Sequence, residues 1–163
     1  MGGGGSGGGG GTTYDVATNP ASPGSGSGSG FNVGTSGGGY VQIVASGTVT
    51  VDGVITMNGL DGAWDSGGGS GGGVYIQCGR LSGSGTIRAN GGNGGGHGGG
   101  GGGGRIALFV RNAPFYTSGN ILCTPSVTGG AKGSAVDGTQ QPGGTGTIYR
   151  DLGKSCGTVL TTW

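Results

Sequence analysis

The sequence predicts an all-β protein, a short parallel β-helix (β-solenoid) of about four coils with long glycine-rich loops. Four segments share the pattern Gly-x-(Ile/Val)-x-x-(Asn/Thr), and they begin at Gly53, Gly85, Gly119 and Gly157. These glycines are 32, 34 and 38 residues apart. Recurrence at such intervals is typical of architectures in which one supersecondary unit stacks on the next. Glycine at this density leaves no amphipathic helical period, so no helix is expected.

Short strands justify each unit in turn. The runs "YVQIVA" from Tyr40, "VYIQC" from Val74, "IALFV" from Ile106 and "IYR" from Ile148 each precede a motif. They are rich in β-branched and aromatic residues and are bounded by glycine, which favours strands. A middle strand is clearest in "TVTV" at 48–51. Each unit is therefore expected to hold two or three strands and one glycine-rich connection.

The motif itself predicts which residues stack. In parallel coils about 4.8 Å apart, equivalent residues lie above one another. The leading glycines would begin each motif strand. The central residues would form an inward apolar column, and the last residues a ladder of hydrogen-bonded side chains at a corner. The column comprises Ile55, Ile87, Ile121 and Val159, and the ladder comprises Asn58, Asn90, Thr124 and Thr162.

Two parts of the chain are expected. Residues 1–39 form a glycine-rich N-terminal segment in which "YDVATN", at 14–19, resembles half of a coil without its leading glycine. Residues 40–163 form the solenoid repeats with their glycine-rich insertions. The alternative is an antiparallel sandwich with long loops, because sandwiches also alternate short strands and turns.

Glycine supplies 52 of the 163 residues, and it fills every position of the run 91–104 except Asn93 and His97. Five prolines and the absence of a Gly-X-Y period exclude a collagen triple helix. Ordering this run costs roughly 6–12 kcal/mol relative to alanine, so the run is either not ordered or is ordered by something that only glycine permits. Extended three-fold helices of the polyglycine-II type would order it in this way, because without Cβ atoms their backbones approach closely and add Cα–H···O contacts.

Charge and motif content argue against several classes. A net charge of +1 without a basic cluster disfavours nucleic acid as a partner, and no apolar stretch is long enough for membrane insertion. His97 has no ligating residue near it in sequence, so no metal site and no cofactor is expected. Glycoside hydrolysis needs two carboxylates at a fixed separation. Because the aspartates of this chain are scattered, we do not expect it to be an enzyme. The aspartates are Asp15, Asp52, Asp61, Asp65, Asp137 and Asp151.

The three cysteines leave two interpretations open. If the protein is extracellular, an odd count fits one internal disulfide and one further thiol. Alternatively, Cys78, Cys123 and Cys156 are all small buried hydrophobic side chains. If a disulfide forms, we expect it between Cys123 and Cys156, because both flank the repeat motif in adjacent coils.

The segment from Gly67 to Val110 resembles the glycine-rich repeats of bacterial surface and extracellular parallel β-helix proteins. "GGGSGGG" is followed by an apolar strand and by "GTIRANGG", and "GGTGTIYR" at 143–150 resembles a closing strand. The chain resembles more loosely the glycine-rich phage adhesins and antifreeze proteins built from bundled polyglycine helices. The resemblance implies an extracellular or cell-surface location and a structural or adhesive role, and it carries over no catalytic residue.

These observations predict a self-assembling extracellular structural protein. Solenoid ends expose unpaired strand edges, which other copies of the chain can extend into a filament. The first alternative is an adhesin or fibre-tip module that binds surface carbohydrate, with its aromatics on one face: Tyr14, Trp64, Tyr75 and Tyr116. An ice-binding protein with a flat Thr-rich face and a carbohydrate-active β-helix enzyme are the remaining alternatives.

Overall fold

The protein is built from short strands in parallel sheets. The computed structural model describes residues 15–28, 33–111, 123–135 and 138–153, and this part of the chain contains no helix. The strands are β1 Tyr40–Val44, β2 Thr48–Thr50, β3 Val54–Thr56, β4 Gly73–Cys78, β5 Arg80–Ser82, β6 Thr86–Arg88, β7 Arg105–Val110, β8 Thr124–Ser126 and β9 Thr147–Asp151. They form the sheets β1-β4-β7-β9, β2-β5 and β3-β6-β8.

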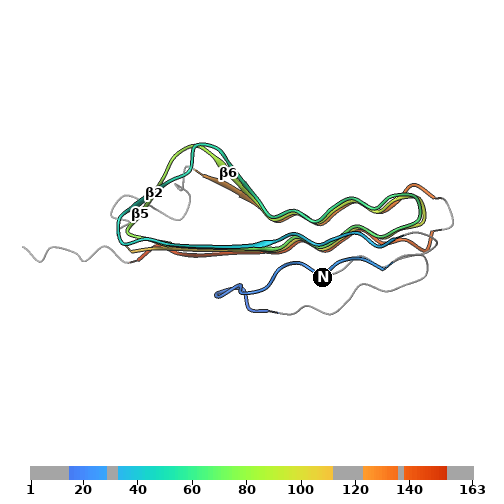
Figure 1. Ribbon diagram of the computed structural model, residues 1–163, viewed down its shortest axis with the longest axis horizontal. Helices are drawn as coiled ribbons and strands as arrows, with labels where there is room; N and C mark the ends of the chain where they lie inside the picture. The colour runs from blue at the N-terminus through green and yellow to red at the C-terminus, as the bar shows by residue number, and fades with distance from the viewer. Residues whose placement is uncertain (1–14, 29–32, 112–122, 136–137, 154–163) are drawn as a thin grey trace, which may run out of the picture.

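The all-β class and the parallel pairing are confirmed. Every strand pairing in the described residues is parallel, so the antiparallel sandwich is wrong for these strands. Unit 1 is residues 40–72 and unit 2 is residues 73–104, and each contributes one strand to every sheet. Unit 3 is residues 105–146, which contribute β7 and β8, and β9 follows it. Figure 1 shows these units one behind another, with the strands at one end.

An apolar core lies between the three sheets. Inward side chains alternate with outward ones along each strand, as the two-residue period of β-structure requires. Ile76 and Leu108 pair in register in the large sheet, and Ile55 pairs with Ile87 in the sheet of β3, β6 and β8. Ile76, Ile87 and Leu108 have no solvent exposure. The column predicted from Ile55 and Ile87 is therefore present where the structure describes it.

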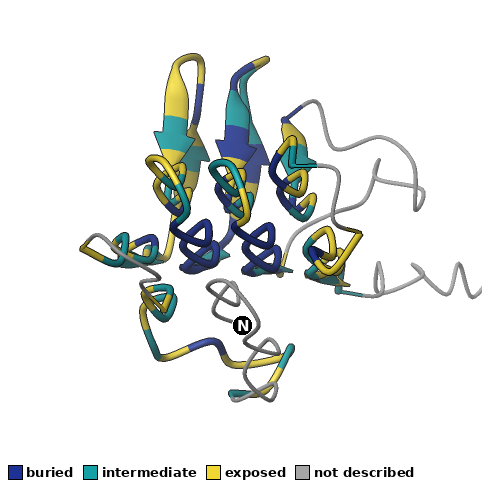
Figure 2. Cartoon of the chain, turned by 90° about the vertical axis from the view of Figure 1, so that its right-hand side faces the viewer, coloured by how far each residue is buried: buried dark blue, intermediate teal, exposed yellow. Residues whose placement is uncertain are grey.

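Beyond the sheets, the glycine-rich segments run out and back as two layers (Figure 1). We call 57–62, 89–95 and 127–133 the outgoing segments. The returning segments are 66–72, 98–104 and 141–146, which lead into β4, β7 and β9, and 33–39, which leads into β1. Figure 2 views them end-on as tight coils, with a row of buried ones at the centre.

Hydrogen bonds between these segments recur every three residues. Gly100 and Gly103 donate their N–H groups to the carbonyls of Gln141 and Gly144 in the neighbouring returning segment. Gly101 and Gly104 donate instead to the outgoing segment 89–95, at the carbonyls of Gly92 and Ala89. A period of three is that of an extended left-handed helix with three residues per turn and no internal hydrogen bonds. Each segment is thus held by its neighbours.

At many contacts between these segments only glycine fits. A Cβ atom on Gly101 would lie under 3.0 Å from the carbonyl oxygen of Gly69, and one on Gly104 equally close to that of Gly72. Real Cβ atoms essentially never come so close, and the obstructing atoms are backbone. The glycine run is therefore a packed part of the protein, where backbone touches backbone.

The N-terminal part contributes further extended chain. The amide of Gly24 donates to Gly38, and that of Ser70 donates to Ser25, so the segment 24–28 lies against two returning segments. The predicted half-coil at 14–19 adds no strand to a sheet in its described part, because Val16 and Asn19 bridge to each other. Residues 33–39 run into β1 as 66–72 run into β4, so the structure is continuous across position 39.

Candidate functional site

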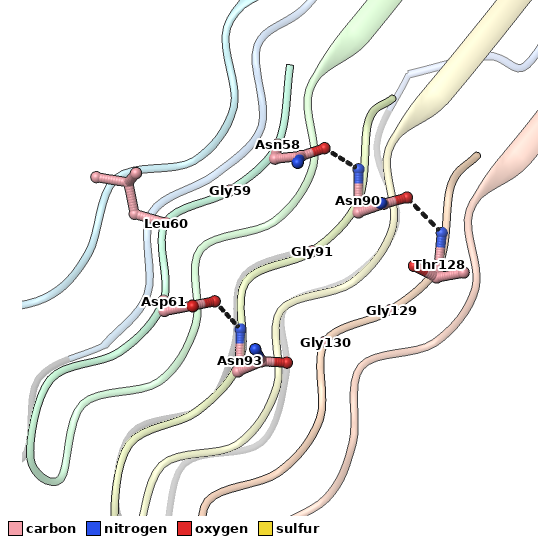
Figure 3. A pocket seen from close by; sticks show the side chains of 10 residues that line it. All are labelled: Asn58, Gly59, Leu60, Asp61, Asn90, Gly91, Asn93, Thr128, Gly129 and Gly130. Carbon is pink, nitrogen blue, oxygen red and sulfur yellow. Dashed lines mark hydrogen bonds between the residues drawn. The ribbon is translucent and has the colours of Figure 1, made fainter. Parts of the chain in front are cut away.

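A ladder of Asn and Asp side chains covers the outgoing segments (Figure 3). Asn58 accepts the backbone N–H of Asn90 at its Oδ1 atom, 2.8 Å away, and Asn90 accepts that of Thr128 at 2.9 Å. Three residues along, Asp61 accepts the N–H of Asn93 at 2.6 Å, and Asn93 accepts that of Ala131 at 2.8 Å. The predicted ladder at Asn58 and Asn90 is therefore present, as side chain to backbone bonds.

The ladder compensates for a missing layer of chain. Inside the assembly of glycine segments, N–H groups bond to carbonyls of neighbouring segments. The outer face of the outgoing layer has no further described segment above it, so the Asx oxygen of the preceding unit takes the place of a carbonyl. Between the rungs lies an open groove of about 490 Å³ with a glycine floor. Its lining is Asn58, Gly59, Leu60, Asp61, Asn90, Gly91, Asn93, Thr128, Gly129 and Gly130.

The register of unit 3 differs from the motif alignment. Thr124 pairs with Thr86 and Pro125 pairs with Ile87, so the equivalence of Thr124 with Asn90 is wrong. Thr128 occupies the ladder position instead. The true counterpart of "GTIRANGG" is "CTPSVTGG" at 123–130, and its closing "TGG" was the available signal. Five predicted motif residues lie outside the described residues: Gly119, Ile121, Gly157, Val159 and Thr162.

The turn between outgoing and returning segments carries a histidine and a carboxylate. Asp65 Oδ1 lies 2.8 Å from His97 Nδ1 and also accepts the His97 backbone N–H at 3.2 Å. The hydrogen bond from the His97 side chain, followed by that from its backbone, holds the pKa of Asp65 below its usual value. Thus His97 extends the Asx ladder to the turn. Among the described residues, no three His, Cys, Asp or Glu side chains gather to hold a metal ion.

Cys78 and Cys123 are buried thiols without a disulfide between them. Cys123 Sγ faces the backbone carbonyls of Ser82 and Gly83 at 3.6 and 3.5 Å. Burial raises the pKa of both thiols, and their mutual proximity raises that of Cys78 further. The expected partner in a disulfide, Cys156, lies outside the described residues.

Along the outgoing segments, one set of backbone hydrogen bonds runs forward, from each unit to the next. Gly59 and Gly62 of unit 1 donate to the carbonyls of Asn90 and Asn93 in unit 2, and Gly91 and Gly94 of unit 2 donate to Thr128 and Ala131 in unit 3. In unit 3 the equivalent N–H groups belong to Gly129 and Lys132. They donate to no other residue that the structure describes.

The stack therefore has two unlike edges. The forward edge comprises β8, β9 and the segments 127–133 and 141–146. The rear edge comprises β1, β2, β3 and the segments 33–39 and 57–62. Apolar side chains concentrate on rear-edge elements, where Val33, Val44, Val54 and Leu60 are 60 to 88 % exposed.

An aromatic row crosses the outer face of the large sheet. Phe109 lies between Tyr75 and Tyr149, with ring centroids 5.3 and 5.4 Å apart. Tyr75 donates its hydroxyl to Gln77 Oε1 at 2.9 Å. A cavity of about 300 Å³ opens beside the row. Its lining is Tyr75, Gln77, Phe109, Val110, Arg111, Asp151 and Gly153.

The aromatic side chains predicted to share one face do not meet where they can be compared. Tyr75 lies on β4 of the large sheet, whereas Trp64 lies at the far turn of the glycine segments and is 80 % exposed. Tyr14 and Tyr116 lie outside the described residues.

The chain matches no protein family, no curated protein and no solved structure. No helix in the described residues is long and apolar enough to cross a membrane.

Proposed function

We propose that this chain is an extracellular structural protein, a short β-solenoid with polyglycine-II-type segments whose copies associate edge to edge into a filament or surface fibre. The observation that carries the proposal is the set of forward hydrogen bonds along the outgoing segments, which recurs from unit 1 to unit 2 and from unit 2 to unit 3. In each unit, backbone N–H groups at equivalent positions donate to carbonyls of the next unit. The last of these donors are the N–H groups of Gly129 and Lys132, which have no acceptor among the described residues.

The rear edge supplies the complementary surface. Thr86 donates backward to Gly53 and Thr124 donates backward to Gly85. The equivalent residue of unit 1 is Val54, whose N–H faces away from β6 because amides in a parallel strand alternate between its two neighbours. If the rear edge of one copy packed on the forward edge of another, the pairing between the two copies would continue the register that successive units have within the chain. A head-to-tail contact that repeats the stacking between units adds each copy along the direction of the stack, so we expect an open filament and no closed ring.

Hydrogen bonds on several sides hold the glycine-rich segments in place. The returning segments are buried along 66–72 and 98–104 and exchange hydrogen bonds with neighbours on several sides. A rod held in this way resists bending without needing a large apolar core. The near-neutral charge of +1 also leaves little repulsion between copies.

Sedimentation velocity and negative-stain microscopy of the purified protein at micromolar concentration test the proposal. We expect filaments whose amount rises steeply with concentration. The variant Val54→Pro removes a rear-edge donor, and we expect shorter or fewer filaments. Val54→Thr is its matched control, because units 2 and 3 carry threonine at this position. A monodisperse monomer for the unmodified protein would overturn the proposal.

A second candidate function is binding of surface carbohydrate, as an adhesin would require. It is favoured by the aromatic row and its adjoining cavity, where Gln77, Arg111 and Asp151 offer polar groups beside aromatic rings. Sugars present apolar C–H faces and hydroxyl groups. A site that combines aromatic rings with polar side chains can contact both.

A glycan array tests this second function. We expect Phe109→Ala to abolish any binding that the unmodified protein shows, while Val44→Ala on the outer face of the same sheet leaves it unchanged. The absence of glycan binding by the unmodified protein would exclude this function.

A further inference from the structure

Two prolines of the forward edge lie where the preceding units carry forward hydrogen-bond donors. The first is Pro142. Gly68 donates its N–H to Gly99, and the equivalent Gly100 donates to Gln141, both at 2.9 Å. Arg105 pairs with Thr147, which is 42 residues later. The same offset makes Pro142 the equivalent of Gly100. Proline has no N–H to donate.

The second is Pro125, which pairs with Ile87 in register. The amides on either side show which way this position donates. Thr86 donates backward to Gly53, and Ala89 donates forward to Ser126. Because amides alternate in a parallel strand, the N–H of Ile87 points forward to β8. The amide of residue 125 would therefore face the next copy, and proline removes it.

Neither proline disturbs its own unit. The proline ring holds φ at about −65°, which suits the extended polyproline-II backbone of a three-fold helix such as that around residue 142. At residue 125 the ring is on an edge strand, where proline is tolerated when its nitrogen faces away from the sheet. The rear edge carries no proline in residues 33–62. The two edges thus differ in how well they accept another chain.

We infer that Pro125 and Pro142 act as a brake on assembly at the forward edge. This inference rests on the proposed function. Each proline leaves a carbonyl of an incoming copy without its donor, and a buried acceptor without a donor is unfavourable. The partner is a second copy of this chain, and the brake sets the concentration above which copies add to one another.

The double variant Pro125→Ile and Pro142→Gly tests the brake, because it installs the residues that unit 2 carries at these positions. We expect the critical concentration for filament formation, measured by light scattering and pelleting, to fall about tenfold for each restored donor. Pro23→Ser is the control, since it removes a proline from the N-terminal segment and leaves the forward edge intact. We expect it to leave the critical concentration unchanged.

A second variant removes a donor from the forward edge where the double variant restores two. Its effect on assembly cannot be attributed to a more stable fold. Lys132→Pro removes a forward N–H from an exposed residue whose extended backbone suits proline. We expect it to raise the critical concentration about tenfold, while Lys132→Ala, which removes the same charge, leaves it unchanged.

The outcomes separate the brake from the proposed function. Filaments of the unmodified protein with an unaltered critical concentration in the double variant would overturn the brake and leave the proposed function standing. Filaments of the double variant alone would support the brake and overturn filament formation by the unmodified protein. If neither protein assembles, both proposals fail.

Discussion

The strand region and the glycine region of this protein pack in opposite ways. Between the three sheets, side chains such as Ile76 and Leu108 fill the interior and are fully buried. Between the outgoing and returning segments, backbone packs directly on backbone and side chains are excluded. The first region depends on removing apolar area from water, and the second on hydrogen bonds to neighbouring segments.

This difference teaches that a low apolar content does not prevent order. Glycine runs are costly to order, and the cost is offset here because each segment has neighbours on several sides. The stability of the glycine region should consequently be most sensitive to added atoms, and that of the strand region to removed atoms. The following substitutions test this contrast, from the largest expected effect to the smallest.

Gly101→Ala should have the largest effect, because it adds one methyl group where none fits. The new Cβ would overlap the carbonyl of Gly69, which is backbone and cannot swing aside. We expect a loss of about 4 kcal/mol or more in the free energy of unfolding, measured by urea denaturation.

Gly47→Ala is the matched control for this substitution, since a Cβ there has nothing within 4 Å. We expect a change near zero or a gain of about 0.4–1 kcal/mol, from the reduced entropy of the unfolded chain. Equal stability of the two alanine variants would contradict close packing in the glycine region.

Ile87→Ala removes atoms from the strand region and should cost about 3 kcal/mol in the same measurement. Its side chain is fully buried and stacks on Ile55 in register. Val54→Ala is a suitable comparison on the preceding strand, because that side chain is 61 % exposed and should change stability little. A loss under about 1 kcal/mol for Ile87→Ala would show that this column is not part of the core.

Asn90→Ala should cost less, about 1–2 kcal/mol, because it removes only one rung of the ladder. The Oδ1 atom accepts from the Thr128 amide and from the Ser126 hydroxyl, both partly open to water. Faster hydrogen exchange at the amide of Thr128 would report the loss locally. Asn90→Asp retains the acceptor oxygen and should preserve protection of that amide, and equal exchange in both variants would argue against the ladder.

The effect of pH on the far turn should be smallest. The pKa of Asp65 is lowered in the folded protein, so its contact with His97 contributes stability above the ordinary carboxyl pKa of 3.8. That contribution is lost as pH falls through the lower folded pKa. A carboxyl carbon NMR titration should give a midpoint below 3.8 for Asp65, and His97→Ala should raise it toward that value.

Much of this architecture could be predicted from local sequence. The runs that begin near Tyr40, Val74, Ile106 and Ile148 are strands, and Ile55 pairs with Ile87 as the motif spacing indicates. These features follow from β-branched and aromatic residues bounded by glycine, which act over a few neighbouring positions. The ladder at Asn58 and Asn90 could be predicted for the same reason, since a constant spacing places equivalent residues side by side.

The alignment of unit 3 could not be predicted in this way. "GNILCT" at 119–124 fits the motif locally, yet β8 takes the next segment and places Thr128 on the ladder. The pairing depends on hydrogen bonds to β6 across a longer connection, which a local pattern does not contain. The continuation of the ladder to Asp61, Asn93 and His97 could not be predicted, because these residues lie outside the motif.

The sequence by itself determined the composition of the two regions, most of the strand positions and the spacing between the first two units. Side-chain type and the freedom of glycine act locally, so these properties are present in the chain before it folds. Only the tertiary structure decided which segments exchange hydrogen bonds, where Cβ atoms are forbidden, and that the forward edge presents Pro125 and Pro142. Those properties depend on neighbours brought together across one repeat of the chain, because an extended three-fold helix has no hydrogen bonds of its own.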